Sequence, residues 1–369
     1  MSYSLPLMKA SRSDAAFRPL QALIESRIED GLIPGAVVAV GRAGGIAFHR
    51  ALGRRALLPR REPMTPRTIL DLASLTKVMA TAPLIVERAV RGELSLLDPV
   101  ERHVAETRGS RVGAIPLHHL LTHTAGLQAD NPQEDFAAGK SSLLARIARE
   151  PLEAEPGTRF VYSDVGYILL QAVLEQGARR RLDRLAEAEL FGPLRFRDTR
   201  FGIREMDRSR TAPTERERGA WLRGRVHDPR ARSRALGGIA GHAGIFGTAI
   251  EAARYCEMIL NRGRIGSRRV LAEETVRAMT TDQCGGVAGV RRGFGFDIES
   301  PYAAPRGRLF SRNSFGHSGW TGVSLWIDPE SDAYIVLLTN AIHPGGHKDL
   351  KLFRADAATL AARALGARG

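Results

Sequence analysis

The stretch Asp71-Leu72-Ala73-Ser74-Leu75-Thr76-Lys77 places a serine and a lysine three residues apart at the start of a predicted helix. At this spacing both side chains lie on one helix face, with Cβ atoms about 5–6 Å apart. The positive end of the helix dipole favours an alkoxide or an oxyanion at such a serine. A lysine, unlike an arginine, can take the serine proton if its pKa is lowered. The pattern indicates a nucleophilic serine, but a capping serine beside a surface lysine explains these four residues more simply.

The composition is that of an ordinary globular chain. Its 369 residues are 43% hydrophobic and 25% charged, and no apolar segment is long enough to span a bilayer. Residues 1–9 lack the basic region and apolar run of a signal peptide. The two cysteines, Cys256 and Cys284, have no metal-ligand spacing and form no disulfide framework. We expect a cytoplasmic protein without a metal or organic cofactor.

The formal net charge of +14 raises the question of a nucleic-acid surface. The arginines are scattered, often beside acidic residues, and aromatic residues make up only 6% of the chain, too few for a base-stacking platform. We therefore expect a solvated arginine-rich surface that attracts anions, with no nucleic-acid or membrane partner.

Hydrophobic periodicity predicts helices and strands in a mixed order. The first part reads as a helix over 14–30, strands at 35–40 and 45–48, a loop over 52–68, and a helix from Ser74 to Arg91 that Pro83 kinks or shortens and Gly92 caps. Residues 93–234 show little strand signal and predict helices at 117–121, 143–148, 165–176 and 181–191. The last part predicts helices at 249–262 and 348–365 and strands at 293–298, 322–327 and 334–339.

This order indicates an α/β (α+β) fold, with an antiparallel sheet flanked by helices and a mostly α lobe. We expect a single domain over residues 1–369. Its α/β lobe covers about 14–80 and 235–369, and its mostly α lobe covers about 81–234. The close trio His118, His119 and His123 could bind a metal, but no fourth ligand with suitable spacing follows, so we predict a structural role.

Two further motifs carry candidate site residues. Tyr162-Ser163-Asp164 is the only Tyr-x-Asp, and a tyrosine beside a cationic lysine loses its proton more easily. It could equally pack at the foot of a helix. His317-Ser318-Gly319-Trp320 is predicted to open the strand that ends near residue 327, where a free N–H can donate to an oxyanion. His242-Ala243-Gly244 has the same His-x-Gly form, so this triplet is not specific alone.

The order of these motifs resembles the serine β-lactamase-like superfamily, which includes class C β-lactamases, DD-peptidases and family VIII carboxylesterases. Ser-x-x-Lys, Tyr-x-Asn and Lys/His-Thr/Ser-Gly are its signatures. The segments 120–127, 240–246 and 316–322 are also similar to family segments. The resemblance extends from about residue 18 to the C-terminus and implies a β-lactamase/transpeptidase-like fold.

The resemblance also implies a role for each motif. Ser74 is the nucleophile that becomes acylated, Lys77 and Tyr162 share the proton transfers, and the backbone N–H groups of Ser74 and Trp320 form the oxyanion hole. The same resemblance assigns Asp164, His317, Ser318 and Gly319 to substrate binding.

Two departures from the family pattern bear on mechanism and substrate. Asp164 replaces the usual asparagine, and its negative charge would keep Lys77 protonated and shift the role of base to Tyr162. His317 replaces the lysine of the penicillin binders, which weakens the expectation of a β-lactam or peptidoglycan carboxylate. We predict a carboxylesterase-like serine hydrolase that acts on a small ester or amide. The alternatives are a β-lactamase or D-alanyl-D-alanine carboxypeptidase, and a non-catalytic binding protein of the same fold.

Overall fold

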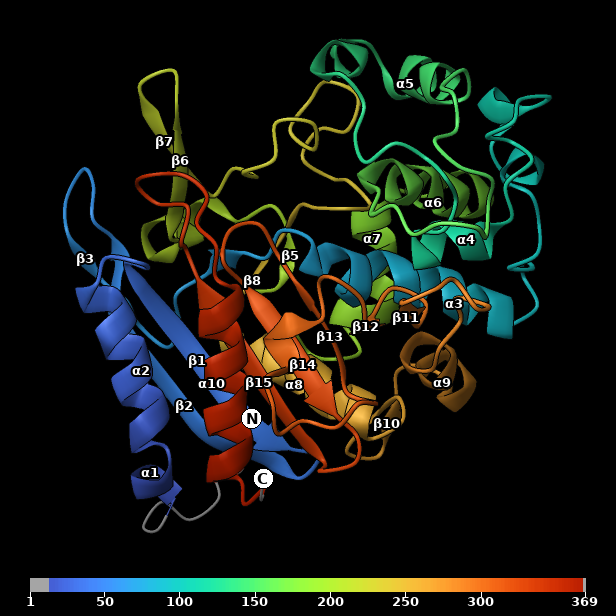
Figure 1. The fold of residues 1–369 in the computed structure, drawn as a ribbon. Coiled ribbons are helices and arrows are strands. Elements are labelled where there is room, and N and C mark those ends of the chain that lie inside the picture. The colour runs from blue at the N-terminus through green and yellow to red at the C-terminus, as the bar shows by residue number, and fades with distance from the viewer. Residues whose placement is uncertain (1–12, 368–369) are drawn as a thin grey trace.

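A computed structural model describes residues 13–367, and in this range its largest sheet has eight antiparallel strands (Figure 1). The strand order is β11–β12–β13–β14–β15–β1–β2–β3, so the N-terminal hairpin lies beside β15 from near the C-terminus. The strands are β1 (Gly35–Arg42), β2 (Gly45–Ala56), β3 (Glu62–Pro63), β11 (Arg291–Arg292), β12 (Asp297–Glu299), β13 (Phe315–Ser318), β14 (Ser324–Asp328) and β15 (Ala333–Thr339).

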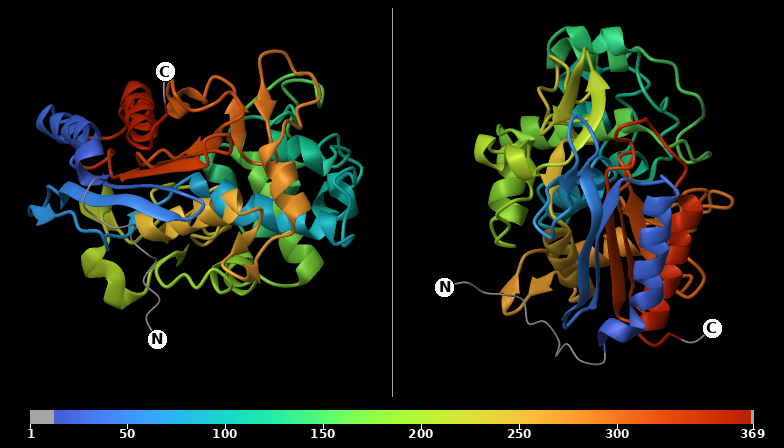
Figure 2. Two further views of the ribbon diagram at one scale, coloured as in Figure 1. Left: turned by 90° about the horizontal axis from the view of Figure 1, so that it is seen from below. Right: turned by 90° about the vertical axis from the view of Figure 1, so that its left-hand side faces the viewer.

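Helices cover both faces of this sheet. Helices α2 (Arg18–Glu29) and α10 (Lys351–Ala364) lie side by side on one face, and α8 (Ala249–Leu260) packs on the other (Figure 2). The apolar run in β1 follows from this arrangement, since successive side chains of a strand point to opposite faces. Val38 packs among the residues of α2 and α10, while Val37 packs in the core that contains α8.

The helical part of the molecule follows α3 (Ala82–Val90). It contains α4 (Leu117–Thr122), α5 (Lys140–Ile147), α6 (Asp164–Ala178) and α7 (Leu182–Ala186). The predicted helices in this region are confirmed, as are those at 14–30, which forms α1 (Ser13–Ala16) and α2, at 249–262 and at 348–365. No helix within residues 13–367 has the length and apolar character that a membrane crossing requires.

The helix that carries the Ser-x-x-Lys motif is irregular. A π-helical turn, η1 (Lys77–Thr81), precedes α3, and the N–H of Ala82 bonds to the carbonyl of Lys77. Pro83 follows in the first turn of α3, which continues to Val90, so the proline does not shorten the helix as predicted; the irregularity is the π-helical turn just before it. Gly92 ends the helix with φ +73°, the left-handed conformation expected of a helix cap.

Several strand predictions were wrong. The predicted loop over 52–68 contains the end of β2 and all of β3. The prediction missed these strands because this edge of the sheet is rich in arginine and lacks the apolar signature of a strand. The hairpin of β6 (Pro213–Glu217) and β7 (Ala220–Arg223) lies in the region expected to be helical. The strand predicted at 293–298 begins only at Asp297, and the one at 322–327 begins at Ser324. Helix α9 (Glu273–Thr280) and the short pair β9 (Arg264–Ile265) and β10 (Arg268–Arg269) were not predicted.

A small three-stranded sheet leads the chain into the serine motif. In it, β8 (Ile245–Gly247) lies between β4 (Leu70–Asp71) and β5 (Arg200–Phe201). Pairing of Leu70 with Gly247 and of Asp71 with Phe246 fixes the chain just before Ser74.

Candidate active site

Ser74 and Lys77 are in contact, as their spacing predicted. Lys77 Nζ donates to Ser74 Oγ at 2.9 Å and to the backbone carbonyl of His242 at 3.2 Å. The Lys77 side chain is fully buried. The pair therefore forms a closed contact inside the protein and is not a capping serine beside a surface lysine.

Asp164 controls the charge of Lys77. It begins α6, next to the N-cap Ser163, and its Oδ1 lies 2.6 Å from Lys77 Nζ. Burial alone would lower the pKa of Lys77, but the Asp164 carboxylate raises it above its usual range. Lys77 is therefore an ammonium group at neutral pH, and an unpaired lysine base is not present in the resting site.

Tyr162 lies against the same lysine. Lys77 Nζ is 5.0 Å from the centroid of the Tyr162 ring, and the Tyr162 hydroxyl interacts with both Lys77 and Ser74. Burial raises the pKa of Tyr162, and Lys77 opposes this only in part. The Tyr162 ring stacks on that of His123 with the centroids 4.3 Å apart. His123 Nδ1 in turn accepts a hydrogen bond from the backbone N–H of Ser163 at 3.1 Å. Tyr162 is thus held as a neutral phenol, pressed against the serine and the lysine.

The histidine trio contributes to packing and hydrogen bonding. Burial lowers the pKa of His123 well below its usual value, so its ring is neutral behind Tyr162. The rings of His118 and His119 pack together with their centroids 3.9 Å apart, and His119 Nδ1 forms a hydrogen bond with Thr124 Oγ1 at 2.8 Å. These contacts fit the structural role predicted for the trio.

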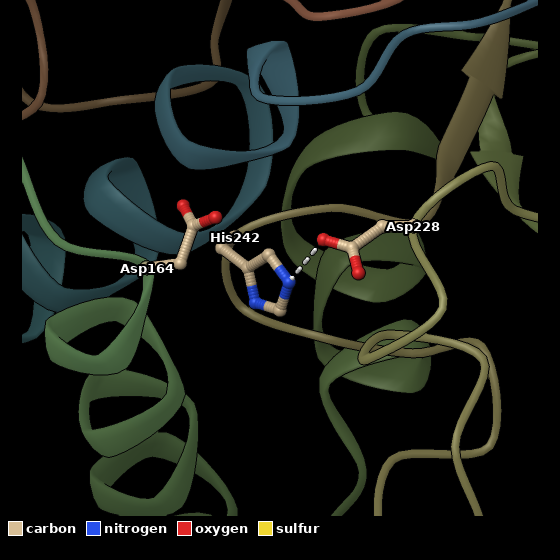
Figure 3. Close-up of side chains that lie close together, drawn as sticks. All are labelled: Asp164, Asp228 and His242. Atoms are coloured by element: carbon tan, nitrogen blue, oxygen red, sulfur yellow. Dashed lines mark hydrogen bonds and ion pairs between the residues drawn. The ribbon is translucent and has the colours of Figure 1, made fainter. Parts of the chain in front are cut away.

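Among the described residues, a different trio has ligand atoms close enough to hold a metal: Asp164, Asp228 and His242 (Figure 3). Asp164 is already paired with Lys77, and His242 Nε2 bonds to Asp228 Oδ2 at 3.0 Å. Because these contacts already compensate both carboxylates, we interpret the cluster as a hydrogen-bonded wall of the site.

The His317 motif ends a strand and does not open one, which corrects the prediction. His317 and Ser318 are the last residues of β13, and a tight turn through Gly319 leads into β14. Strand β12 pairs with β13 only at Gly316, so the end of β13 is free of a neighbour on that side. The sequence prediction failed because β13 is only four residues long and contains a glycine.

His317 is neutral. Its Nδ1 bonds to the carbonyl of Ser318 at 2.8 Å and therefore carries the proton. Burial, with further contributions from Lys77 and Arg292, lowers the pKa of His317 well below its usual value. The ring lies 6.0 Å from that of Tyr162, so the histidine is near the site but brings no positive charge.

The two N–H groups predicted for an oxyanion hole are available. In the chain from 13 to 367, neither the backbone N–H of Ser74 nor that of Trp320 donates a hydrogen bond. Trp320 is 52% exposed, and its ring stacks on that of His347 with the ring centroids 3.8 Å apart. Both residues border a pocket of about 720 Å³ that Tyr162, Asp164, His317, Ser318 and Gly319 also line.

Arg354 is a pocket residue that the sequence reasoning missed. It lies on the first turn of α10 and donates to the carbonyls of Gly319 and Val323, at 3.0 and 3.2 Å. Burial lowers the pKa of Arg354 to about 10, so it is still charged at pH 7. It forms no ion pair within residues 13–367, although the charge of Asp349, which lines the same pocket, raises its pKa. Nothing in the sequence distinguishes it from the many other arginines.

An antiparallel sheet between helices, with a serine–lysine pair at the start of a helix beside it, is characteristic of the serine β-lactamase-fold hydrolases. The chain belongs to the Beta-lactamase family, whose family model matches residues 20–359. This family places the protein among hydrolases.

Individual relatives carry different names. The chain is 29% identical over 371 residues to an N-acetylmuramyl-L-alanine amidase of Bacillus subtilis (strain 168), covering 90% of this chain and 83% of the relative. It is 30% identical over 309 residues to a "Putative D-alanyl-D-alanine carboxypeptidase" of Escherichia coli (strain K12), covering 76% and 70%. The solved structure of EstCE1, a hydrolase with promiscuous acyltransferase activity, has a TM-score of 0.76 at 23% identity, with 94% of this chain and 99% of that chain covered. The last similarity shows the fold alone.

Proposed function

We propose that the protein hydrolyses small esters through an acyl-enzyme on Ser74. The observation that carries this proposal is the 2.9 Å contact between Ser74 Oγ and Lys77 Nζ, at the edge of a pocket with two free backbone N–H groups. In the tetrahedral intermediate, the N–H groups of Ser74 and Trp320 donate to the oxyanion. Such donors contribute about 10²–10³ each to kcat.

The proton of Ser74 needs an acceptor, because Lys77 is already protonated. The shortest path crosses Lys77 to Asp164, over contacts of 2.9 and 2.6 Å. In this path Lys77 takes the proton from Ser74 while it gives one of its own to Asp164. It remains an ammonium beside the developing alkoxide, and Asp164 is the terminal base. This differs from the expectation from sequence that Tyr162 takes over the role of base.

Tyr162 is placed to donate a proton to the leaving group. Its hydroxyl interacts with both Ser74 and Lys77 and is protonated at neutral pH. After it donates, the adjacent ammonium stabilises the phenolate. The proton stored on Asp164 then returns over Lys77 to Tyr162.

A neutral substrate is supported by the state of His317. The Nδ1–H of His317 is used by Ser318, and the ring carries no charge to pair with a substrate carboxylate. A short ester makes no such demand. We expect kcat/KM for p-nitrophenyl butyrate to exceed that for nitrocefin by orders of magnitude, and His317→Lys to narrow the gap.

Arg354 supports a second candidate, hydrolysis of a substrate that carries a carboxylate. Its guanidinium is charged and buried, and in residues 13–367 it forms no ion pair; Asp349, on the same pocket wall, opposes the effect of burial on its pKa. A D-alanyl-D-alanine peptide or a β-lactam offers such a carboxylate, and several relatives bear the name "Putative D-alanyl-D-alanine carboxypeptidase". The choice of a neutral ester as substrate rests on the neutral His317, whereas the choice of a substrate with a carboxylate rests on Arg354.

The test combines labelling with a substrate panel. A fluorophosphonate should form one adduct, mapped by mass spectrometry to Ser74, and Ser74→Ala should lose both the adduct and ester turnover. Substantial turnover by Ser74→Ala refutes the nucleophile. Efficient cleavage of nitrocefin or a D-Ala-D-Ala peptide, with feeble ester cleavage, replaces the esterase proposal with the second candidate.

A further inference from the structure

We propose that Asp71 is a positioning residue that holds the two halves of the oxyanion hole at a fixed separation, with its carboxylate held in place by His227. This inference rests on the proposed function, because it concerns the same hole. Asp71 ends β4, and its carboxylate is fully buried. Segments from three parts of the chain converge on it.

The first segment is the turn into the nucleophile. Asp71 Oδ1 accepts the N–H of Ala73 at 2.9 Å. Ala73 has φ +47°, a left-handed conformation that a residue with a Cβ adopts only at a cost. The carboxylate satisfies the buried N–H of this strained residue and so holds the peptide that carries the N–H of Ser74.

The second segment is the turn after β13. The hydroxyl of Thr321, the residue after Trp320, donates to the backbone carbonyl of Asp71 at 2.8 Å. Gly319 packs so closely here that an added Cβ would lie 2.9 Å from the Cβ of Ala73. The backbones that carry the two oxyanion donors thus touch one another and are joined by one residue.

The third segment is the loop after β7. His227 offers two donors to Asp71 Oδ2, its backbone N–H at 2.7 Å and its Nδ1–H at 3.0 Å. With the N–H of Ala73, this gives the buried carboxylate three donors, enough to offset much of its desolvation. Burial alone would lower the pKa of His227, but Asp71 raises it, and Asp228 and Glu215 act in the same direction.

This arrangement gives Asp71 a catalytic consequence without contact with substrate. Two donors stabilise an oxyanion only when both point at one site, and a displacement of about 1 Å can cost about 10²-fold in rate. Loss of the Thr321 hydroxyl frees the half of the hole that carries the Trp320 N–H, and loss of the Asp71 carboxylate frees the half that carries the Ser74 N–H.

The test compares single-atom changes. Thr321→Val should lower kcat/KM for p-nitrophenyl butyrate roughly 10- to 100-fold and weaken binding of a phenylboronic acid, whose adduct on Ser74 is tetrahedral, by the same factor. Thr321→Ser, which keeps the hydroxyl, should restore both. Asp71→Asn keeps an acceptor for Ala73 but sets an NH₂ group against His227, and should show the same parallel losses.

Thr107→Val is the matched control. Thr107 is also a buried threonine whose hydroxyl donates to a carbonyl, that of Val104 at 2.8 Å, and it does not line the pocket. Thr107→Val should lower the stability of the protein about as much as Thr321→Val does, and it should leave kcat/KM at the wild-type value. Wild-type values of both readouts in Thr321→Val overturn the inference, as does a loss that thermal unfolding of the variant fully explains. If Ser74→Ala remains active the proposed function fails; if Ser74→Ala is dead and Thr321→Val is normal, only this inference fails.

Discussion

Replacement of Asp164 by asparagine tests the proton path directly. The substitution keeps the shape of the side chain and removes its charge, 2.6 Å from Lys77 Nζ. Coulomb's law at an effective dielectric of 20 gives about 6 kcal/mol for this pair, an upper bound because Asp164 is partly exposed. The pKa of Lys77 falls in the variant, since burial lowers it and the charge of Asp164 no longer opposes this, which leaves only Tyr162 to do so.

The expected result is a loss of activity that depends on pH. A terminal base contributes roughly 10²–10⁴-fold, so Asp164→Asn should lose about 100-fold or more in kcat/KM at pH 7. Lys77 can serve as base in the variant only when it is neutral. Its kcat/KM should therefore rise about tenfold per pH unit on the acid side of the new pKa of Lys77, whereas the wild type, whose Lys77 stays protonated, should show no such rise.

The assay is kcat/KM for p-nitrophenyl butyrate from pH 5 to pH 10, with enzyme quantified by fluorophosphonate labelling. Asp135→Asn is the matched control, since Asp135 pairs with Arg146 at 2.7 Å outside the pocket. It should leave the pH profile unchanged. Wild-type or higher activity of Asp164→Asn at pH 7 would refute the path over Asp164 and return the role of base to Tyr162 or Lys77.

Four further outcomes are expected. Tyr162→Phe should lose about 10²-fold in kcat with the fold intact, measured by steady-state kinetics and circular dichroism; a near-normal kcat removes Tyr162 from the proton transfers. Arg354→Ala removes the bond to the Gly319 carbonyl, on the peptide that carries the Trp320 N–H, so it should lower kcat/KM for neutral esters as Thr321→Val does; a much larger loss on D-Ala-D-Ala peptides would favour the second candidate. Trp320→Ala keeps the backbone N–H, so it should lower kcat/KM for aryl-acyl esters several-fold more than for acetyl esters, because the exposed indole can stack on a ring; equal losses exclude stacking. Burial would raise the pKa of Glu62, but Arg223 and Arg55 lower it to about 2. This depressed pKa adds stability above about pH 4.5 that is lost as pH falls toward 2, so Glu62→Gln should unfold more easily by about 1–3 kcal/mol at pH 7 and match the wild type near pH 2, as urea titrations can show.

The sequence alone determined the features that depend on neighbours along the chain. Helical spacing set Ser74 and Lys77 on one face, and apolar periodicity placed the principal helices and the N-terminal hairpin, because these patterns reflect local geometry. The order of the motifs was enough to indicate the family. Local patterning failed at short or arginine-rich strands, such as β3 and β13, whose pairing comes from partners elsewhere in the sheet.

Only the tertiary structure decided the charges in the site. Whether Lys77 is protonated depends on two things: its distance from Asp164, which lies on α6, and the complete burial of its side chain. The neutral state of His317, the unpaired charge of Arg354 and the convergence on Asp71 likewise arise between segments far apart in the chain. Electrostatic energy depends on separation in space and on exclusion of water, and sequence spacing specifies neither across such distances.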